Sequence, residues 1–124
     1  MKNRWVLILW VVLAAKPLFA EQMKTYYDNG KVQMEMSDQG MKTYYESGQV
    51  NVETPQQNGA PHGISKTYYE SGKLMSQTEY KNGEVVGVSK IFNENGKLIR
   101  EDDHAKGTWR QYDENGRLVA EGKA

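Results

Sequence analysis

Few side chains in this sequence could carry out catalysis. There is no cysteine, and the only histidines are His62 and His104. Nucleophilic catalysis needs a hydroxyl or thiol beside a base, and a metal centre needs several ligands at suitable spacing. Asp102, Asp103 and His104 have the donor types for a divalent cation, but a run of this kind is more often a solvated acidic loop. We therefore expect no catalytic residue, no metal site and no cofactor.

Acidic residues recur two positions before a glycine. This happens five times, at Asp28, Glu46, Glu70, Glu94 and Glu114. A general acid or base needs one special environment, whereas a carboxylate repeated at one position of a turn indicates turn chemistry. The recurrence therefore argues against an enzyme.

The aromatic residues fit a binding role better. Tyr27, Tyr45 and Tyr69 each lie three residues before one of these glycines, and in two further copies the same position holds Asn93 and Asp113. Large aromatic side chains on a polar surface are favoured anchors for a partner. They could equally pack across the turn on the stem of a lysine or glutamine. We predict the three tyrosines as a binding surface, with the packing role as an open alternative.

The repeated unit that carries these residues reads as a β-hairpin. KTYYDNGKV at 24–32 recurs at 42–50 and 66–74, and in weaker form at 90–98 and 110–118. Its third position is always aromatic and its ninth is always Val or Leu. A three-residue loop that ends in a left-handed glycine places these two positions opposite each other, as Tyr68 and Leu74. Five copies predict an all-β, antiparallel meander of about ten strands in an elongated, twisted sheet.

Alternation of apolar and polar residues continues into the strands after the turns. Val32, Met34 and Met36 alternate with polar residues, which predicts that all three lie on one face. Residues 54–62 are expected to form the longest loop, and residues 101–106 the next. The lysines that begin the repeats are expected to protect sheet edges: Lys24, Lys42, Lys66 and Lys90.

Residues 1–20 have the order of a secretory signal peptide. Lys2 and Arg4 precede an unbroken apolar run from Trp5 to Ala15, and Ala20 offers a small residue for cleavage. A helix of eleven residues spans about 17 Å, well short of the ~30 Å of a bilayer core. We therefore expect a signal helix cleaved after Ala20, a repeat domain over 21–124, and a periplasmic or secreted protein. An uncleaved signal is the alternative.

Charge and composition exclude several classes of partner. The chain has 16 basic and 16 acidic residues, and three of the basic ones lie in residues 1–20, which leaves 13 basic against 16 acidic after cleavage. A net charge near −3 disfavours both nucleic-acid binding and a polybasic membrane contact. About 31% of the residues after position 20 are apolar, too few for a thick core.

The repeats resemble the bacterial MORN-repeat variant, which is seen in exported proteins and in a group labelled YwqK-type antitoxins. The resemblance rests on the Tyr-Tyr-x-x-Gly-Lys-Leu unit and the Asn-Gly-x-x-x-Gly linker, and it covers residues 24–122. Residues 66–92 and 107–118 match most closely, whereas Ser37–Gly40 departs from the linker pattern. The resemblance implies a sheet of β-hairpin repeats and, for the antitoxin group, a toxin as protein partner.

Export, small size, mild acidity and the lack of catalytic chemistry point to a non-enzymatic protein-binding module. The resemblance narrows this to an immunity or antitoxin-type partner of a toxin in the periplasm. One alternative is recognition of an envelope polysaccharide, in which Trp109 would stack on sugar rings. A purely structural envelope role is another. The residues leave the partner's identity and the oligomeric state undetermined.

Overall fold

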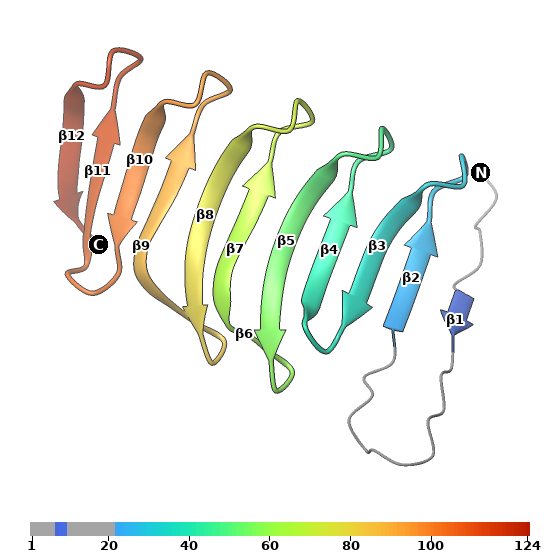
Figure 1. Ribbon diagram of the computed structural model, residues 1–124. Coiled ribbons are helices and arrows are strands. Elements are labelled where there is room, and N and C mark those ends of the chain that lie inside the picture. Colours follow the sequence, from blue (N-terminus) through green and yellow to red (C-terminus); the bar gives the residue numbers. More distant parts are fainter. Residues whose placement is uncertain (1–6, 10–21) are drawn as a thin grey trace.

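The computed structural model describes residues 7–9 and 22–124, which form one antiparallel sheet. Figure 1 shows the strands side by side in a single curved layer. Two short strands are β1 (Leu7–Leu9), which pairs with β2, and β6 (Ala60–Pro61), which pairs with β5. Each repeat contributes two longer strands: β2 Gln22–Tyr26 and β3 Val32–Ser37, β4 Gly40–Tyr44 and β5 Val50–Gln57, β7 Gly63–Tyr68 and β8 Leu74–Lys81, β9 Glu84–Phe92 and β10 Leu98–Asp103, β11 Thr108–Tyr112 and β12 Leu118–Lys123. The expected all-β meander is confirmed.

Each repeat reverses direction through a three-residue loop, as its sequence predicts. In the third repeat the Tyr69 N–H donates to the Lys73 carbonyl and the Gly72 N–H donates to the Tyr69 carbonyl, both at 2.8 Å. Gly72 has a φ of 90°, a left-handed conformation that costs glycine little. Tyr68 then pairs with Leu74, and the aromatic third position pairs with the ninth in all five repeats.

A β-bulge follows each of these turns and changes which side chains share a face. Tyr26 pairs with Val32, but Thr25 pairs with Met34, so one extra residue of β3 lies between the two pairs. Val32 therefore lies on the face of Tyr26, whereas Met34 lies on the face of Thr25. The prediction that Val32, Met34 and Met36 share one face is wrong, because strict alternation does not survive a bulge.

Two of the connections between repeats are tight Asn-Gly turns. Asn58 and Gly59 follow β5, Asn82 and Gly83 follow β8, and both asparagines have positive φ, 53° and 50°. Asn-Gly pairs suit hairpin turns in which both central residues take this conformation. Residues 54–57 belong to β5 and residues 101–103 to β10. The long loops predicted over 54–62 and 101–106 are therefore wrong, because the strands continue up to short turns.

No side chain in residues 22–124 is fully buried. A single layer leaves both faces of the sheet in contact with solvent, so each side chain is covered only by neighbours on the same face. The low apolar content of the repeats is consistent with this arrangement. Stability must come from strand pairing and from contacts between adjacent side chains along each face.

The predicted signal helix lies almost entirely outside the described residues. Within positions 1–20 only Leu7–Leu9 are described, and they form an extended strand, so a helix there is not supported. Every other strand pairing of the sheet lies within residues 22–124. None of the described segments is a helix long and apolar enough to cross a bilayer.

Candidate functional site

The tyrosines predicted as a binding surface link neighbouring repeats. Each hydroxyl reaches over the next hairpin and donates to the carbonyl of that hairpin's third position: Tyr27 to Tyr44, Tyr45 to Tyr68, and Tyr69 to Phe92. The last two bonds measure 2.6 and 2.8 Å. All three rings are half-buried. These tyrosines thus have a role in holding the sheet together, and their use as anchors for a partner stays a prediction.

The fourth and fifth repeats use the same position differently. Asn93 Oδ1 accepts hydrogen bonds from the N–H groups of Asn95 and Lys97 within its own turn. Asp113 Oδ1 accepts the corresponding pair from Asn115 and Arg117. At this position a short polar side chain therefore accepts hydrogen bonds within its own loop, whereas a tyrosine donates a hydrogen bond to the next repeat. The change from Tyr to Asn and Asp marks a difference between the first three hairpins and the last two.

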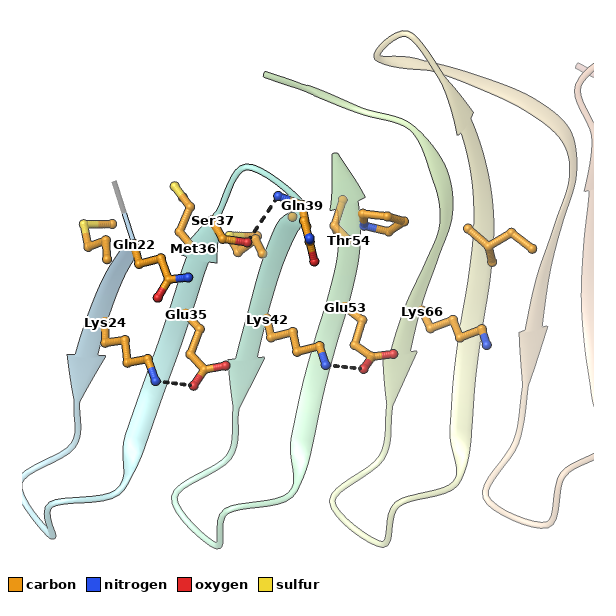
Figure 2. Close-up of a pocket in the computed structure, with 15 residues that line it drawn as sticks. Gln22, Lys24, Glu35, Met36, Ser37, Gln39, Lys42, Glu53, Thr54 and Lys66 are labelled. Carbon is orange, nitrogen blue, oxygen red and sulfur yellow. Dashed lines mark hydrogen bonds and ion pairs between the residues drawn. The ribbon is translucent and has the colours of Figure 1, made fainter. Parts of the chain in front are cut away.

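The strand register lines up a second set of side chains in a row across the sheet. Every repeat begins with Lys or Arg and has Glu or Gln eleven residues later, and these two positions pair with each other. The same carboxylates also pair with the first residue of the following repeat. Figure 2 shows the first five members crossing β2 to β7 on one side of the sheet. We call these ten residues the charged row: Lys24, Glu35, Lys42, Glu53, Lys66, Gln77, Lys90, Glu101, Arg110 and Glu121.

Ion pairs connect several neighbours within the charged row. Lys24 Nζ lies 3.2 Å from Glu35 and Lys42 Nζ lies 3.4 Å from Glu53. Arg110 lies 3.5 Å from Glu121 and 3.9 Å from Glu101. Each such exposed pair contributes little by itself. The expectation that the repeat lysines protect edges is wrong for three of them, because Lys42, Lys66 and Lys90 lie on the interior strands β4, β7 and β9.

Tyrosines at the third repeat position reinforce the charged row. Each donates from its hydroxyl to the carboxylate of the preceding repeat: Tyr44 to Glu35 at 2.9 Å, Tyr68 to Glu53 at 3.2 Å, and Tyr112 to Glu101 at 2.6 Å. A lysine on one side and a phenol on the other therefore hold Glu35 and Glu53 in place, whereas Arg110 and Tyr112 both reach Glu101 from β11. The sequence signal for this arrangement is the constant spacing of eleven, but the bulge after each turn decides which face the residues share.

The pKa values of one such pair are shifted in opposite directions. Burial has the largest effect on Glu35 and raises its pKa, but the hydrogen bonds from Tyr44 and Lys24 and the charges of Lys24 and Lys42 together bring it below the ordinary value. The pKa of Tyr44 is raised, first by burial and then by its hydrogen bond to Glu35. Both shifts favour a charged carboxylate that accepts from a neutral phenol.

The pattern is interrupted at the third repeat. Gln77 stands where the other repeats have Glu, and it pairs with Lys66 on one side and Lys90 on the other. Phe92 stands where the following repeat would supply the tyrosine hydroxyl. Neither lysine has an ion pair among the described residues. The carboxylate and its phenol partner are thus absent together, and two lysines flank a neutral amide.

A groove of about 570 Å³ lies on the charged face over β2 to β7. The first five members of the charged row line it, together with the apolar side chains of Pro55 and Ile64. Ile64 is 48% exposed, an unusual exposure for a large aliphatic side chain. Charges of alternating sign therefore follow one another at the strand spacing of about 4.8 Å, beside an apolar margin. This surface suits an extended segment of another macromolecule.

Trp109 is packed against its neighbours on the opposite face of the sheet. The guanidinium of Arg100 lies over its ring at 5.1 Å from the centroid, and Arg100 also forms a 2.7 Å ion pair with Asp102. A methyl group added at Gly122 would come within 3.0 Å of the indole. Arg100 thus covers one face of the ring, and the glycan contact of Trp109 stays a prediction.

The histidines and the acidic run are separate from the groove. His62 Nδ1 accepts from the Asn82 N–H at 3.2 Å, and His104 Nε2 lies 2.8 Å from the Ser89 hydroxyl. Asp102 and Asp103 are consecutive strand residues and so point to opposite faces. Among the described residues, no three His, Cys, Asp or Glu side chains are grouped in a way that would hold a metal ion.

A family model described as MORN repeat variant matches five segments of the chain. They are residues 22–37, 41–58, 61–82, 85–104 and 105–123, and each corresponds to one of the five hairpins. No curated protein was found to match.

Proposed function

Since the chain belongs to the MORN repeat variant family, we propose that it is an exported, non-enzymatic module that binds another protein. Repeat sheets of this kind are scaffolds, so the function must be argued from the surface that they present. The surface that supports the proposal is the groove over β2 to β7, where charges of alternating sign lie beside exposed Ile64.

The groove favours a protein partner over a small substrate. Its charged side chains lie in a line across five strands, so a ligand must be extended to meet them all. A protein segment with charges of both signs would exchange hydrogen bonds and ion pairs with the row, and Ile64 would lose exposed area to an apolar partner residue. Because the groove lies in a sheet that strand pairing holds rigid, little ordering entropy would be lost on binding.

Export is supported by the order of residues 1–20. Lys2 and Arg4 precede the apolar run, and Ala20 follows it as a small residue. The resemblance to exported repeat proteins points the same way. Within that setting we propose a toxin acting in the envelope as the partner, with the groove covering a functional surface of that toxin.

The proposal is tested by affinity purification from envelope extract of the native host, with a groove variant and a matched control. The groove variant is Ile64→Ser with Lys66→Ala, because Lys66 has no ion pair among the described residues to lose. The control is Val85→Ser with Lys81→Ala, which makes the same chemical changes outside the groove. Wild type and control should retain one stoichiometric protein, and the groove variant should lose it at least about tenfold, the equivalent of ~1.4 kcal/mol.

Two results would contradict the proposal. One is a clean preparation of the wild-type chain with no protein partner. The other is equal recovery of a partner by the groove variant and the control, which would place binding on another surface. If binding lies on another surface, the variant Tyr45→Phe with Tyr69→Phe tests whether the tyrosine hydroxyls take part in it. This variant keeps both rings and removes only the bonds to the next hairpin.

A further inference from the structure

The outer edge of β12 shows an exposure that the other repeats do not. Leu118 occupies the ninth repeat position and is 48% exposed, and Val119 beside it is 58% exposed. The corresponding residues of the four preceding repeats are half-buried: Val32, Val50, Leu74 and Leu98. Each of those four has another hairpin beside it, whereas β12 pairs only with β11 in the described residues. β12 therefore carries the same apolar repeat position as the internal strands, but among the described residues no further strand covers it.

The backbone of this edge is also ready to pair. The Ala124 N–H donates to the Gly107 carbonyl at 2.8 Å, so it points toward β11. N–H groups alternate in direction along a strand, and the N–H of Glu121 therefore points away from β11. Glu121 is the last member of the charged row, and the first member, Lys24, lies on β2 at the other end of the sheet.

We propose that β12 of one copy pairs with β2 of a second copy, so that the sheet and the charged row continue from chain to chain. Inside the chain, each carboxylate of the row pairs with the basic residue that begins the next repeat, as Glu101 does with Arg110. The same register between two copies pairs Glu121 with Lys24 of the second copy. It also pairs Lys123 with Gln22 and Ala120 with Thr25, as Asp103 pairs with Thr108 and Arg100 with Gln111 inside the chain, so no like charges meet.

Residues 7–9 occupy the surface that this contact needs. Leu7 pairs with Lys24 and Leu9 with Gln22, so β1 covers the part of β2 that a second copy would use. Pairing of β1 and pairing of a second copy are mutually exclusive. The inference therefore rests on the proposed export, because cleavage after Ala20 removes β1 and opens the edge of β2. The uncleaved chain would be protected from assembly before it is exported.

The geometry of the contact predicts growth beyond a dimer. Different surfaces of the two copies meet, and each copy keeps one free edge of each kind after pairing. Such a head-to-tail contact forms an open series unless curvature closes a ring. A symmetric pairing of two β12 edges would instead stop at a dimer. The size distribution therefore distinguishes the two arrangements.

The experiment measures the mass of a chain that starts at Glu21 by sedimentation velocity over a wide range of concentration. This chain can be produced directly, because residues 22–124 contain every strand pairing except that of β1. Species larger than a dimer should increase with concentration. Glu121→Lys and Lys24→Glu should each lower the association constant at least about tenfold, because like charges would face each other. Glu114→Lys, the same change at an exposed turn, should leave it unchanged.

Mixing the two charge variants gives the sharpest result. In a mixture of Glu121→Lys and Lys24→Glu chains, every junction between unlike chains again joins a lysine to a glutamate, so association should return. Glu121→Pro removes an outward N–H without removing a bond to β11, and it should abolish association even in the mixture. Circular dichroism confirms that each variant is folded.

The inference is overturned by a chain that stays monomeric, by a dimer that does not grow, or by a mixture that fails to associate. The intact mass of the protein recovered from the periplasm tests cleavage separately. If the chain from Glu21 associates but the protein recovered from the cell is uncleaved, export is contradicted and the edge contact remains supported. Cleavage without association would contradict the edge contact alone.

Discussion

Tyrosine hydroxyls show how a single atom contributes to a sheet without a buried core. Tyr69 donates to the Phe92 carbonyl, which belongs to the next repeat. In a globular domain a carbonyl of this kind would find a partner in the interior, but here both faces of the sheet meet water. Each fourth-position tyrosine therefore adds a bond between repeats that the strand ladder does not supply.

Replacing Tyr69 by Phe should lower the free energy of unfolding by about 0.5–1.5 kcal/mol, the usual net value of one hydrogen bond. The ring stays in place, so the change isolates the hydroxyl. Urea unfolding followed by circular dichroism gives the value. Tyr26→Phe is the control, because the Tyr26 hydroxyl has no hydrogen bond among the described residues. Equal losses in both variants would show that the bond to Phe92 carries no stability.

The lowered pKa of Glu35 predicts that the free energy of unfolding falls in acid. Burial raises its pKa, but Tyr44 and the neighbouring lysines bring the folded value below the ordinary one. At a pH between the two values the unfolded chain binds more protons. The stabilisation is therefore complete above the ordinary pKa of about 4.3 and is lost as the pH falls through the folded pKa.

Thermal unfolding from neutral pH down to about pH 3 tests this expectation, since that range brackets the ordinary glutamate pKa. The midpoint of the wild type should fall in acid, and Glu35→Gln should start lower at neutral pH and fall less. Glu94→Gln, at an exposed turn, is the control and should follow the wild type. A wild-type slope that persists in Glu35→Gln would assign the acid sensitivity to other carboxylates.

At the scale of the hairpin, the turn, the bulge and the charged row act as one unit. The loop sets which residues pair. The first lysine shares the face of the third-position tyrosine by alternation along its strand, and the bulge brings the later glutamate onto that face. Neighbouring turns also contact each other, because Lys31 Nζ donates to the Ser47 carbonyl at 2.9 Å and Lys97 Nζ to the Glu114 carbonyl at 2.9 Å. The first hairpin is therefore held by the second, and the fourth by the fifth, at both turn and strands.

Restoring the missing carboxylate and phenol should stabilise the third and fourth repeats together. Gln77→Glu places a charge between Lys66 and Lys90 and should add about 0.2–1 kcal/mol. Phe92→Tyr alone should change little, because its hydroxyl would lack a carboxylate. The double variant should exceed the sum of the single ones by about 0.5–1 kcal/mol.

A double-mutant cycle of urea unfolding measures this coupling. Gln57→Glu, the same change beside an exposed turn, serves as the control and should show no coupling to Phe92→Tyr. Additive effects of Gln77→Glu and Phe92→Tyr would mean that the phenol and the carboxylate do not meet in this repeat. High salt should reduce the contribution of the charge and leave that of the hydrogen bond.

The whole molecule is a single layer whose stability is shared between neighbours. No side chain of residues 22–124 is fully buried, so no one cluster organises the fold. Each hairpin depends on the hairpins beside it, and the end hairpin has only one. This explains why Leu118 is exposed while Leu74 at the same repeat position is half-buried, and it is the reason that we propose a second copy as the neighbour of β12.

Much of this fold could be predicted from local sequence. The repeat of nine residues determined the hairpins, and the glycine at the end of each loop determined the pairing of Tyr68 with Leu74. These features depend on conformations of a few adjacent residues, which the residue types control directly. The family resemblance, drawn from the same repeats, was confirmed for five segments.

The tertiary structure alone decided which side chains share a face and which surface could bind. One extra residue at each bulge moved Met34 away from Val32 and placed Glu35 beside Tyr44, and alternation in the sequence does not show such a shift. The hydroxyls of Tyr27, Tyr45 and Tyr69 reach carbonyls of another repeat, and that contact exists only when the strands lie side by side. Pairing within a hairpin is local, whereas a groove, a row and an open edge arise from the register between hairpins.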